Sequence, residues 1–127
     1  MSALIPCAAA LAAVDRDDRA MIARLRAAEQ HGLELRTYAM VVPQVWRGRQ
    51  GRQARLARLL RAAGVRAIEH QDGRNSGVLL AATGTADPID ATVVLLAAAG
   101  DRIVTSDPDH LSRLATAAAN RAVIIPC

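Results

Sequence analysis

The chain has 127 residues and a net charge of +4, with 52% hydrophobic and 22% charged residues. This length predicts one domain, residues 1–127, and the composition is too apolar for a disordered chain. Because Tyr38 and Trp46 are the only aromatic residues, a surface that stacks many bases of single-stranded nucleic acid is excluded.

The sequence also argues against a membrane segment and an oxidising compartment. No apolar run reaches the ~18 residues that a membrane-spanning helix needs. The apolar stretch from Leu4 to Val14 has no basic residue before it and is interrupted by Pro6, unlike a secretory signal. Two cysteines, Cys7 and Cys127, are too few for a disulfide framework. We therefore expect a cytoplasmic protein with reduced thiols and no membrane contact.

Short apolar runs alternate with longer amphipathic ones along the chain. In its first half the chain is predicted to form a strand at 3–5, a helix capped at 17 or 18 and ending near 31, a strand at 33–37, a short helix at 40–46 and a helix at 50–63. A strand at 65–69, a turn at 72–77 and a short helix at 78–82 follow. The last predicted elements are a helix at 87–100, a strand at 102–105, a helix at 107–120 and a strand at 122–125.

Helix boundaries follow from capping chemistry and periodicity. Asp17 or Asp18 offers a side-chain cap to the first predicted helix, and Gly32 ends it. In residues 50–63, leucines recur on one side and arginines on the other at about 100° per residue. Strands alternating with helices predict the α/β class, with a central parallel sheet of about five strands covered on both faces.

The charges are unevenly distributed. Six arginines lie between Arg47 and Arg61, and five of the nine aspartates lie between Asp87 and Asp109. An enzyme that grips phosphates and also binds a metal ion would show this division. A basic chain fits a polyanionic partner such as RNA, although the arginine series also fits a plain solvated helix face.

Three acidic or thiol features fall where parallel sheets form their sites, beyond the carboxyl ends of the strands. Cys7 follows the first predicted strand, and residues 105–109 follow the fourth. Asp90 lies three residues after Asp87, so the two carboxylates share one helix face. A divalent cation relieves the repulsion between converging carboxylates, and oxygen ligands suit Mg²⁺ or Mn²⁺. Such an ion activates water for attack on a phosphodiester.

Helix capping is the alternative explanation for two of these aspartates. Asp87 and Asp107 each precede a proline at a predicted helix start, which accounts for both without a metal. Asp90 is flanked by apolar residues in the first turn of its helix and is not needed as a cap. Asp90 is therefore the stronger indication of a metal site.

Several segments in the chain resemble one known family. The runs IDATVVLLA at 89–97 and VTSDPDHL at 104–111 resemble the carboxyl half of a PIN domain, and in particular the VapC-type ribonuclease toxins of bacterial toxin–antitoxin pairs. The runs VWRG at 45–48, RQARLARLL at 52–60 and ALAAVDRDDR at 10–19 resemble an actinobacterial branch of that family. The resemblance covers nearly the whole chain through the order and spacing of these segments.

The resemblance implies a three-layer α/β/α domain and a Mg²⁺- or Mn²⁺-dependent endoribonuclease, a hydrolase with four acidic positions. Asp90 matches the third position and Asp107 the fourth, as metal ligands, with Asp109 as an accessory catalytic carboxylate. The first position is Cys7 and the second is Gln44. A neutral thiol is a poor ligand for a hard cation, so weak metal binding and low activity are expected.

The remaining expectations concern supporting residues and partners. Asp87 and the Gln44 amide oxygen are auxiliary ligands, and Arg47 is the expected phosphate contact. Ser106 either orients water or bonds the local turn. His110 is expected on the surface, and Trp46 in packing. The resemblance implies an RNA substrate, an antitoxin protein as inhibitor, and a homodimer.

Two other functions stay open at this stage. A degenerate PIN domain would bind RNA or an antitoxin without cleaving RNA. An unrelated α/β binding module would use its aspartates only as helix caps. In either case a metal ion would not be required.

Overall fold

The computed structural model describes residues 2–48 and 51–127. Its described residues form a parallel sheet of five strands in the order β3-β2-β1-β4-β5, which confirms the predicted α/β class. The strands are β1 (Ala3–Pro6), β2 (Glu34–Tyr38), β3 (Gly64–Arg66), β4 (Arg102–Thr105) and β5 (Val123–Pro126). The central β1 pairs with β2 on one side and β4 on the other, with Leu4 opposite Leu35 and Arg102.

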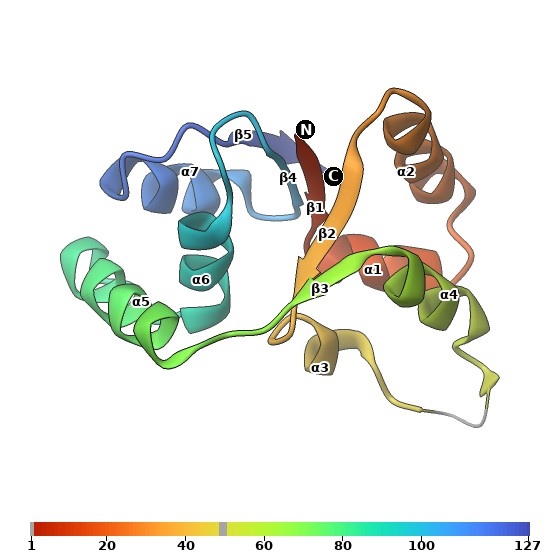
Figure 1. The fold of residues 1–127 in the computed structure, drawn as a ribbon, viewed down its shortest axis with the longest axis horizontal. Coiled ribbons are helices and arrows are strands. Elements are labelled where there is room, and N and C mark those ends of the chain that lie inside the picture. The colour runs from red at the N-terminus through yellow and green to blue at the C-terminus, as the bar shows by residue number, and fades with distance from the viewer. Residues whose placement is uncertain (1, 49–50) are drawn as a thin grey trace.

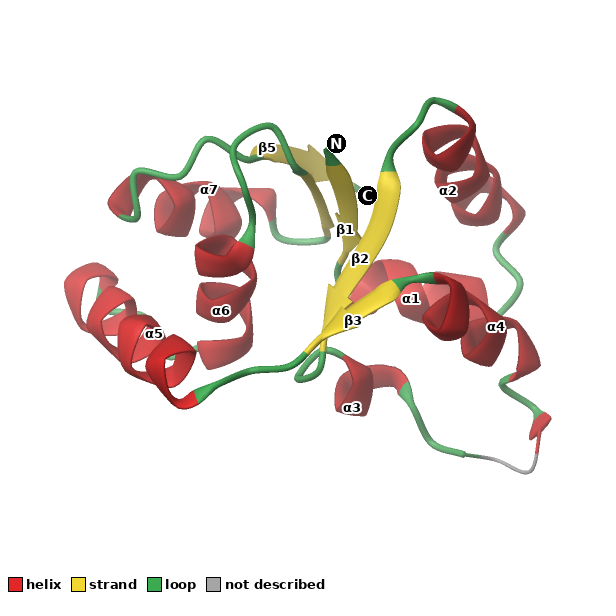
Figure 2. Cartoon of the chain, viewed as in Figure 1, coloured by secondary structure: helices red, strands yellow, loops and turns green. Residues whose placement is uncertain are grey.

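Helices cover both faces of the sheet (Figure 1). They are α1 (Ala8–Asp15), α2 (Arg19–Gln30), α3 (Val42–Val45), α4 (Ala54–Ala62), α5 (His70–Thr83), α6 (Pro88–Leu96) and α7 (Pro108–Ala117). The helices α5, α6 and α7 pack on one another on one side, and α1, α2 and α4 gather on the other (Figure 2). This arrangement agrees with a three-layer α/β/α fold.

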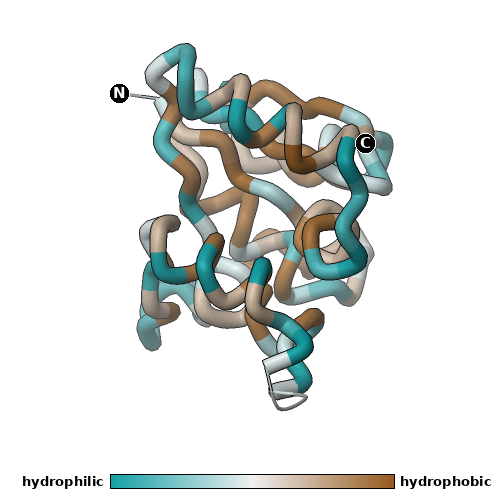
Figure 3. The backbone as a smooth tube through the Cα atoms, turned by 90° about the vertical axis from the view of Figure 1, so that its right-hand side faces the viewer, coloured by the Kyte–Doolittle hydropathy of each residue, from teal (hydrophilic) through white to brown (hydrophobic). Residues whose placement is uncertain are grey.

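The core follows from the alternation of side chains along the strands. In β1, Ala3 and Ile5 belong to a cluster that includes residues of α6 and α7, whereas Leu4 belongs to a second cluster against α1 and α2. A parallel strand buried on both faces has no polar side, and β1 is buried throughout. Hydrophobic and hydrophilic residues alternate along the outer helices (Figure 3).

Two helices differ from the sequence prediction. Helix α1 was not predicted, because it starts one residue after β1 and is apolar on most sides, which hides the helical period. Residues 72–77 lie inside α5 and are not a turn. The start of α5 is a capping box in which the Glu69 N–H donates to Asp72 Oδ2 at 2.9 Å. This capping box favours a helix more strongly than Gly73 and Gly77 disfavour one.

Other boundaries shift at the element ends. Helix α4 begins at Ala54, not at residue 50, and residues 49 and 50 lie outside the described part of the chain. The strand predicted at 65–69 is the shorter β3. Helix α6 ends at Leu96, since Ala97 has extended backbone, and α7 ends at Ala117. The caps at Asp18, Asp87 and Asp107 are confirmed.

Within the described residues, no single helix is long and apolar enough to cross a membrane. Helices α5 and α6 reach the required length and hydropathy only as a pair bent by 111°.

Asp101 joins three parts of the chain at the amino-end edge of the sheet. Its side chain is almost fully buried. Its Oδ1 accepts from the Ala3 N–H at 2.9 Å, and its Oδ2 accepts from the Ala98 N–H at 2.8 Å. The Arg36 guanidinium donates to the same Oδ2 at 3.5 Å. Asp101 is therefore a structural aspartate, at the opposite edge from the predicted site.

Replacement of Asp101 should destabilise the fold. Asp101→Ala leaves two backbone N–H groups without their acceptor and the Arg36 guanidinium with Glu34 as its remaining partner, which we expect to cost about 3 kcal/mol of unfolding free energy. Urea denaturation measures this loss. The exposed Asp109→Ala is the matched control and should cost less than about 1 kcal/mol; equal losses in the two variants would contradict the structural role.

Candidate functional site

The carboxyl edge of the central strands borders a small hollow of about 20 Å³. Its polar lining comes from Cys7 after β1, Gln44 in α3, Asp90 in α6 and Thr105 at the end of β4. A volume of this size is close to that needed for one water molecule. The parallel pairing of β1 with β4 thus brings together residues from four distant parts of the chain.

Cys7 is a half-buried residue that joins β1 to α1. Its N–H donates to the Val104 carbonyl at 2.8 Å, and its own carbonyl accepts from the Leu11 N–H at 3.0 Å. Its side chain packs against the cluster formed with α1 and α2. This packing agrees with a small hydrophobic role for the thiol, which leaves the first acidic position of the resemblance without a charge.

Asp87 and Asp90 stand at the start of α6. Asp87 Oδ1 accepts from the N–H groups of Ile89 and Asp90 at 3.0 and 3.1 Å, so Asp87 acts as the N-cap. Asp90 does not cap the helix, and its side chain is 28% exposed. Burial first, and then the neighbouring charge of Asp87, raise the pKa of Asp90 to about 6, against the opposing effect of His110.

His110 comes from the first turn of α7 and faces Asp90. Its Nε2 lies 3.5 Å from Asp90 Oδ2, and its side chain is only 13% exposed, so the expected surface position is wrong. One ligand atom each from Asp87, Asp90 and His110 lies within 4.8 Å of the others. The signal in the sequence is the spacing: His110 lies three residues after the cap Asp107, in the turn that follows β4.

The other residues of the 105–109 segment have separate roles. Asp107 Oδ1 accepts from the His110 N–H at 3.2 Å, and its charge contributes to the raised pKa of Asp90. The Asp107 N–H donates to Thr105 Oγ1 at 3.0 Å. The hydroxyl that forms a hydrogen bond within this turn is therefore that of Thr105. Ser106 and Asp109 are exposed.

Arg47 is exposed, and its guanidinium is engaged by its own segment. It donates to the carbonyls of Pro43 and Trp46 at 2.8 Å each and to the Gln44 carbonyl at 3.4 Å. A phosphate contact would have to compete with these bonds. Trp46 is 39% exposed, so it is not a core residue.

Gln53 was not singled out by sequence reasoning, yet it organises this segment. It is 3% exposed, and its Oε1 accepts from the N–H groups of Arg47 and Gly48 at 2.7 and 3.0 Å. Its Nε2 donates to Asp15 Oδ2 at 3.0 Å and to the Val45 carbonyl at 2.9 Å. A glutamine among arginines gives no periodic signal, so only the tertiary structure reveals this role.

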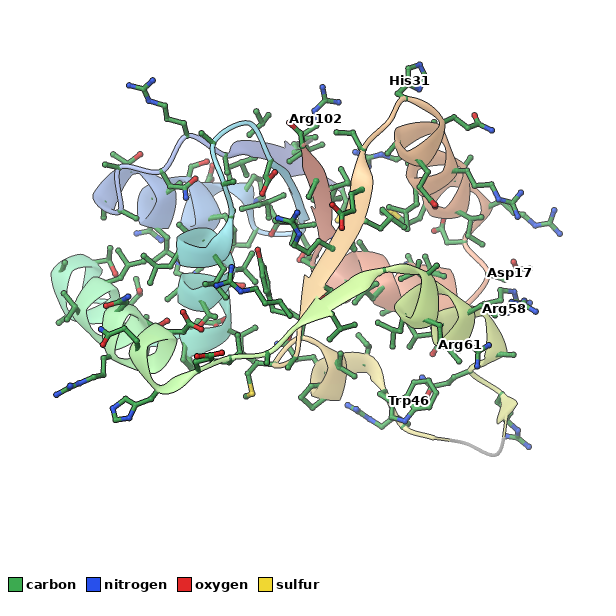
Figure 4. The ribbon with its side chains drawn as sticks, in the orientation of Figure 1. Asp17, His31, Trp46, Arg58, Arg61 and Arg102 are labelled. Carbon is green, nitrogen blue, oxygen red and sulfur yellow. The ribbon has the colours of Figure 1, made fainter. Side chains whose placement is uncertain are left out.

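A groove of about 440 Å³ lies between α2 and α4, away from the acidic edge. Its floor is apolar, and its rim carries four arginines and two acids: Arg19, Arg26, Arg55, Arg58, Asp17 and Glu29. Arg55 Nε lies 3.2 Å from Asp17 Oδ1. Figure 4 shows Arg58 and Asp17 together at this side of the molecule.

The ligand atoms at the acidic edge fit a divalent cation, although the set is smaller than a full four-carboxylate site. Asp87 and Asp90 supply two carboxylates, with the charge of Asp107 near, while Cys7 and Gln44 supply no charge. Carboxylate oxygens and an imidazole nitrogen are accepted ligands of first-row dications. The set is smaller than the four acids of the resemblance.

Comparisons with protein-family models, with curated proteins and with solved structures found no match to this chain.

The raised pKa of Asp90 predicts a specific pH dependence of stability. Because the folded chain holds the Asp90 proton more tightly than the unfolded chain, the free energy of unfolding falls as pH rises from about 4 to about 6. Asp90→Asn removes this term. Relative to the wild type, the variant should gain about 2 kcal/mol between pH 4.5 and 7.5.

Urea denaturation in EDTA at both pH values measures this gain, and ¹³C NMR of the carboxyl groups gives the midpoint of Asp90 directly. The exposed Asp109→Asn is the control and should show no comparable gain. A midpoint for Asp90 near 4 would show that its burial and the Asp87 charge do not act as described.

Proposed function

We propose that this protein is a metal-dependent endoribonuclease with weak cation affinity, of the toxin type that the sequence resembles. The observation that carries the proposal is the placement of Asp90 at the carboxyl edge of β1 and β4, with the charges of Asp87 and Asp107 close enough to act on it. A dication relieves the repulsion between the partly buried Asp90 carboxylate and the two exposed carboxylates near it.

Asp90 and Asp107 are the residues assigned to hold Mg²⁺ or Mn²⁺, with Asp87 as auxiliary ligand. The bound ion would supply an activated water and offset negative charge on the phosphate. The chain itself positions Asp107. The hydrogen bond from the Asp107 N–H to Thr105 Oγ1 fixes the turn before α7. Asp109 and Ser106, both exposed at that turn, are within the region that RNA would contact.

RNA is the proposed substrate because the chain is basic and because a dication at the acidic edge would suit phosphodiester hydrolysis. The net charge of +4 favours approach of a polyanion. Arg47, which bonds to the Gln44 carbonyl, is assigned to contact the phosphate. To do so, its guanidinium would give up its hydrogen bonds to backbone carbonyls. A cognate antitoxin, a homodimeric state and a cytoplasmic location belong to the same proposal and rest on the resemblance.

A second candidate function is binding without cleavage. It is favoured by Cys7 and Gln44, which line the same hollow as Asp90 and carry no charge. The groove between α2 and α4 supports it, since an apolar floor with four arginines on its rim suits an amphipathic acidic segment of a partner protein. In that case Asp90 would be dispensable for function.

RNA cleavage should depend on a dication and on Asp90. With a structured RNA and Mn²⁺ or Mg²⁺, we expect slow cleavage that EDTA abolishes and that Asp90→Asn lowers by about a hundredfold or more. Fragment analysis by gel measures the rate. Asp72→Asn, on α5, is the control and should cleave at the wild-type rate. Binding of RNA with no cleavage in any metal would favour the second candidate.

Restoring a carboxylate at the end of β1 should strengthen cation binding. We expect Cys7→Asp to raise Mg²⁺ and Mn²⁺ affinity by roughly tenfold, because affinity at oxygen sites rises with the number of charged ligands. Isothermal titration calorimetry measures both ions. Cys7→Ser is the neutral control and should leave the affinities unchanged; equally tight binding by the wild type and Cys7→Asp would contradict the weak-site proposal.

A further inference from the structure

We propose that His110 joins Asp90 and the auxiliary ligand Asp87 as a direct ligand of the proposed cation, and that this site therefore prefers Mn²⁺ to Mg²⁺. The inference rests on the proposed function only in requiring that this edge binds a dication. It adds a nitrogen ligand to a site that the sequence predicted to be built of oxygens.

The geometry of the three side chains favours a shared ion. Their ligand atoms lie within 4.8 Å of one another, and His110 Nε2 is 3.5 Å from Asp90 Oδ2. Ligand bonds of about 2.1 Å place neighbouring ligand atoms about 3 Å apart and opposite ones about 4.2 Å apart. The spread of the three ligand atoms is thus close to that of a coordination shell. The distance of 3.5 Å between His110 Nε2 and Asp90 Oδ2 is too long for a good hydrogen bond.

The helix caps leave atoms free for this role. Asp87 uses Oδ1 to cap α6, and Asp107 uses Oδ1 to cap α7 at the His110 N–H. The second oxygen of Asp87 is not engaged by its cap. Asp107 holds the backbone of His110, so the cap also fixes the start of the helix turn that presents the imidazole.

Two members of the triad, Asp90 and His110, are partly buried, whereas Asp87 is exposed. The side chain of His110 is 13% exposed and that of Asp90 is 28% exposed, and they come from different helices, α7 and α6. The partly buried carboxylate of Asp90 has the like charge of the exposed Asp87 beside it. A dication bound by all three groups removes this repulsion.

The imidazole also sets the choice of ion. Carboxylates accept both Mg²⁺ and Mn²⁺, whereas imidazole is a ligand for first-row transition ions and rarely for Mg²⁺. Cys7 and Gln44, which line the hollow together with Asp90, supply no charged oxygen that would favour Mg²⁺. The preference for Mn²⁺ over Mg²⁺ therefore follows from the imidazole ligand.

The test uses Mn²⁺ alone on the full chain. Pulsed EPR of the wild type with one equivalent of Mn²⁺ should show the coupling of an imidazole nitrogen, and calorimetry should show tighter binding of Mn²⁺ than of Mg²⁺. His110→Asn should lose the nitrogen coupling and about tenfold or more of the Mn²⁺ affinity, with little change for Mg²⁺. His70→Asn, exposed on α5, is the matched control and should behave as the wild type.

Each outcome decides the proposal. Absence of nitrogen coupling in the wild type overturns it without any variant, so a folding defect of His110→Asn cannot obscure the result. Coupling that survives in His110→Asn but disappears in His70→Asn also overturns it, by assigning the nitrogen elsewhere. Because RNA plays no part in these measurements, nitrogen coupling together with an absence of RNA cleavage would support His110 as a ligand and reject the nuclease.

Discussion

The parallel pairing of β1 with β4 is the constraint on which the candidate site depends. It aligns the carboxyl ends of the two central strands, so that Cys7 and Thr105 come to the same edge and line one hollow with Asp90 of α6. Asp101 holds the opposite edge of this pair through the Ala3 N–H and the Arg36 guanidinium.

Crowding of charge around Asp90 follows from this constraint. Asp87 lies one turn back on the same helix, and Asp107 caps the neighbouring one, so two negative charges act on a carboxyl with limited access to water. His110 is the nearby group that opposes them. The chemistry of the edge is therefore set by α6 and α7, whereas the β1 and α3 side contributes a thiol and an amide.

Capping and metal binding are compatible at this edge. The sequence left open whether Asp87 and Asp107 cap helices or bind a cation. The structure shows the caps, each made with Oδ1. A carboxylate has two oxygens, so a cap does not exclude a ligand role, and the metal site remains a proposal that the binding experiments decide.

Local patterns were sufficient to predict the α/β class and the parallel sheet and to offer Asp18, Asp87 and Asp107 as candidate caps, because alternation of apolar runs and Asp-Pro starts act over a few residues. The pattern missed α1, whose buried surroundings remove its helical period, and the first half of α5, where a capping box outweighed two glycines; the helix predicted at 78–82 is the second half of α5. The partners of His110 and Gln53 were decided only by the tertiary structure. Their contacts join residues 20 and 38 positions apart, and no local periodicity reports which side chains meet across such a distance.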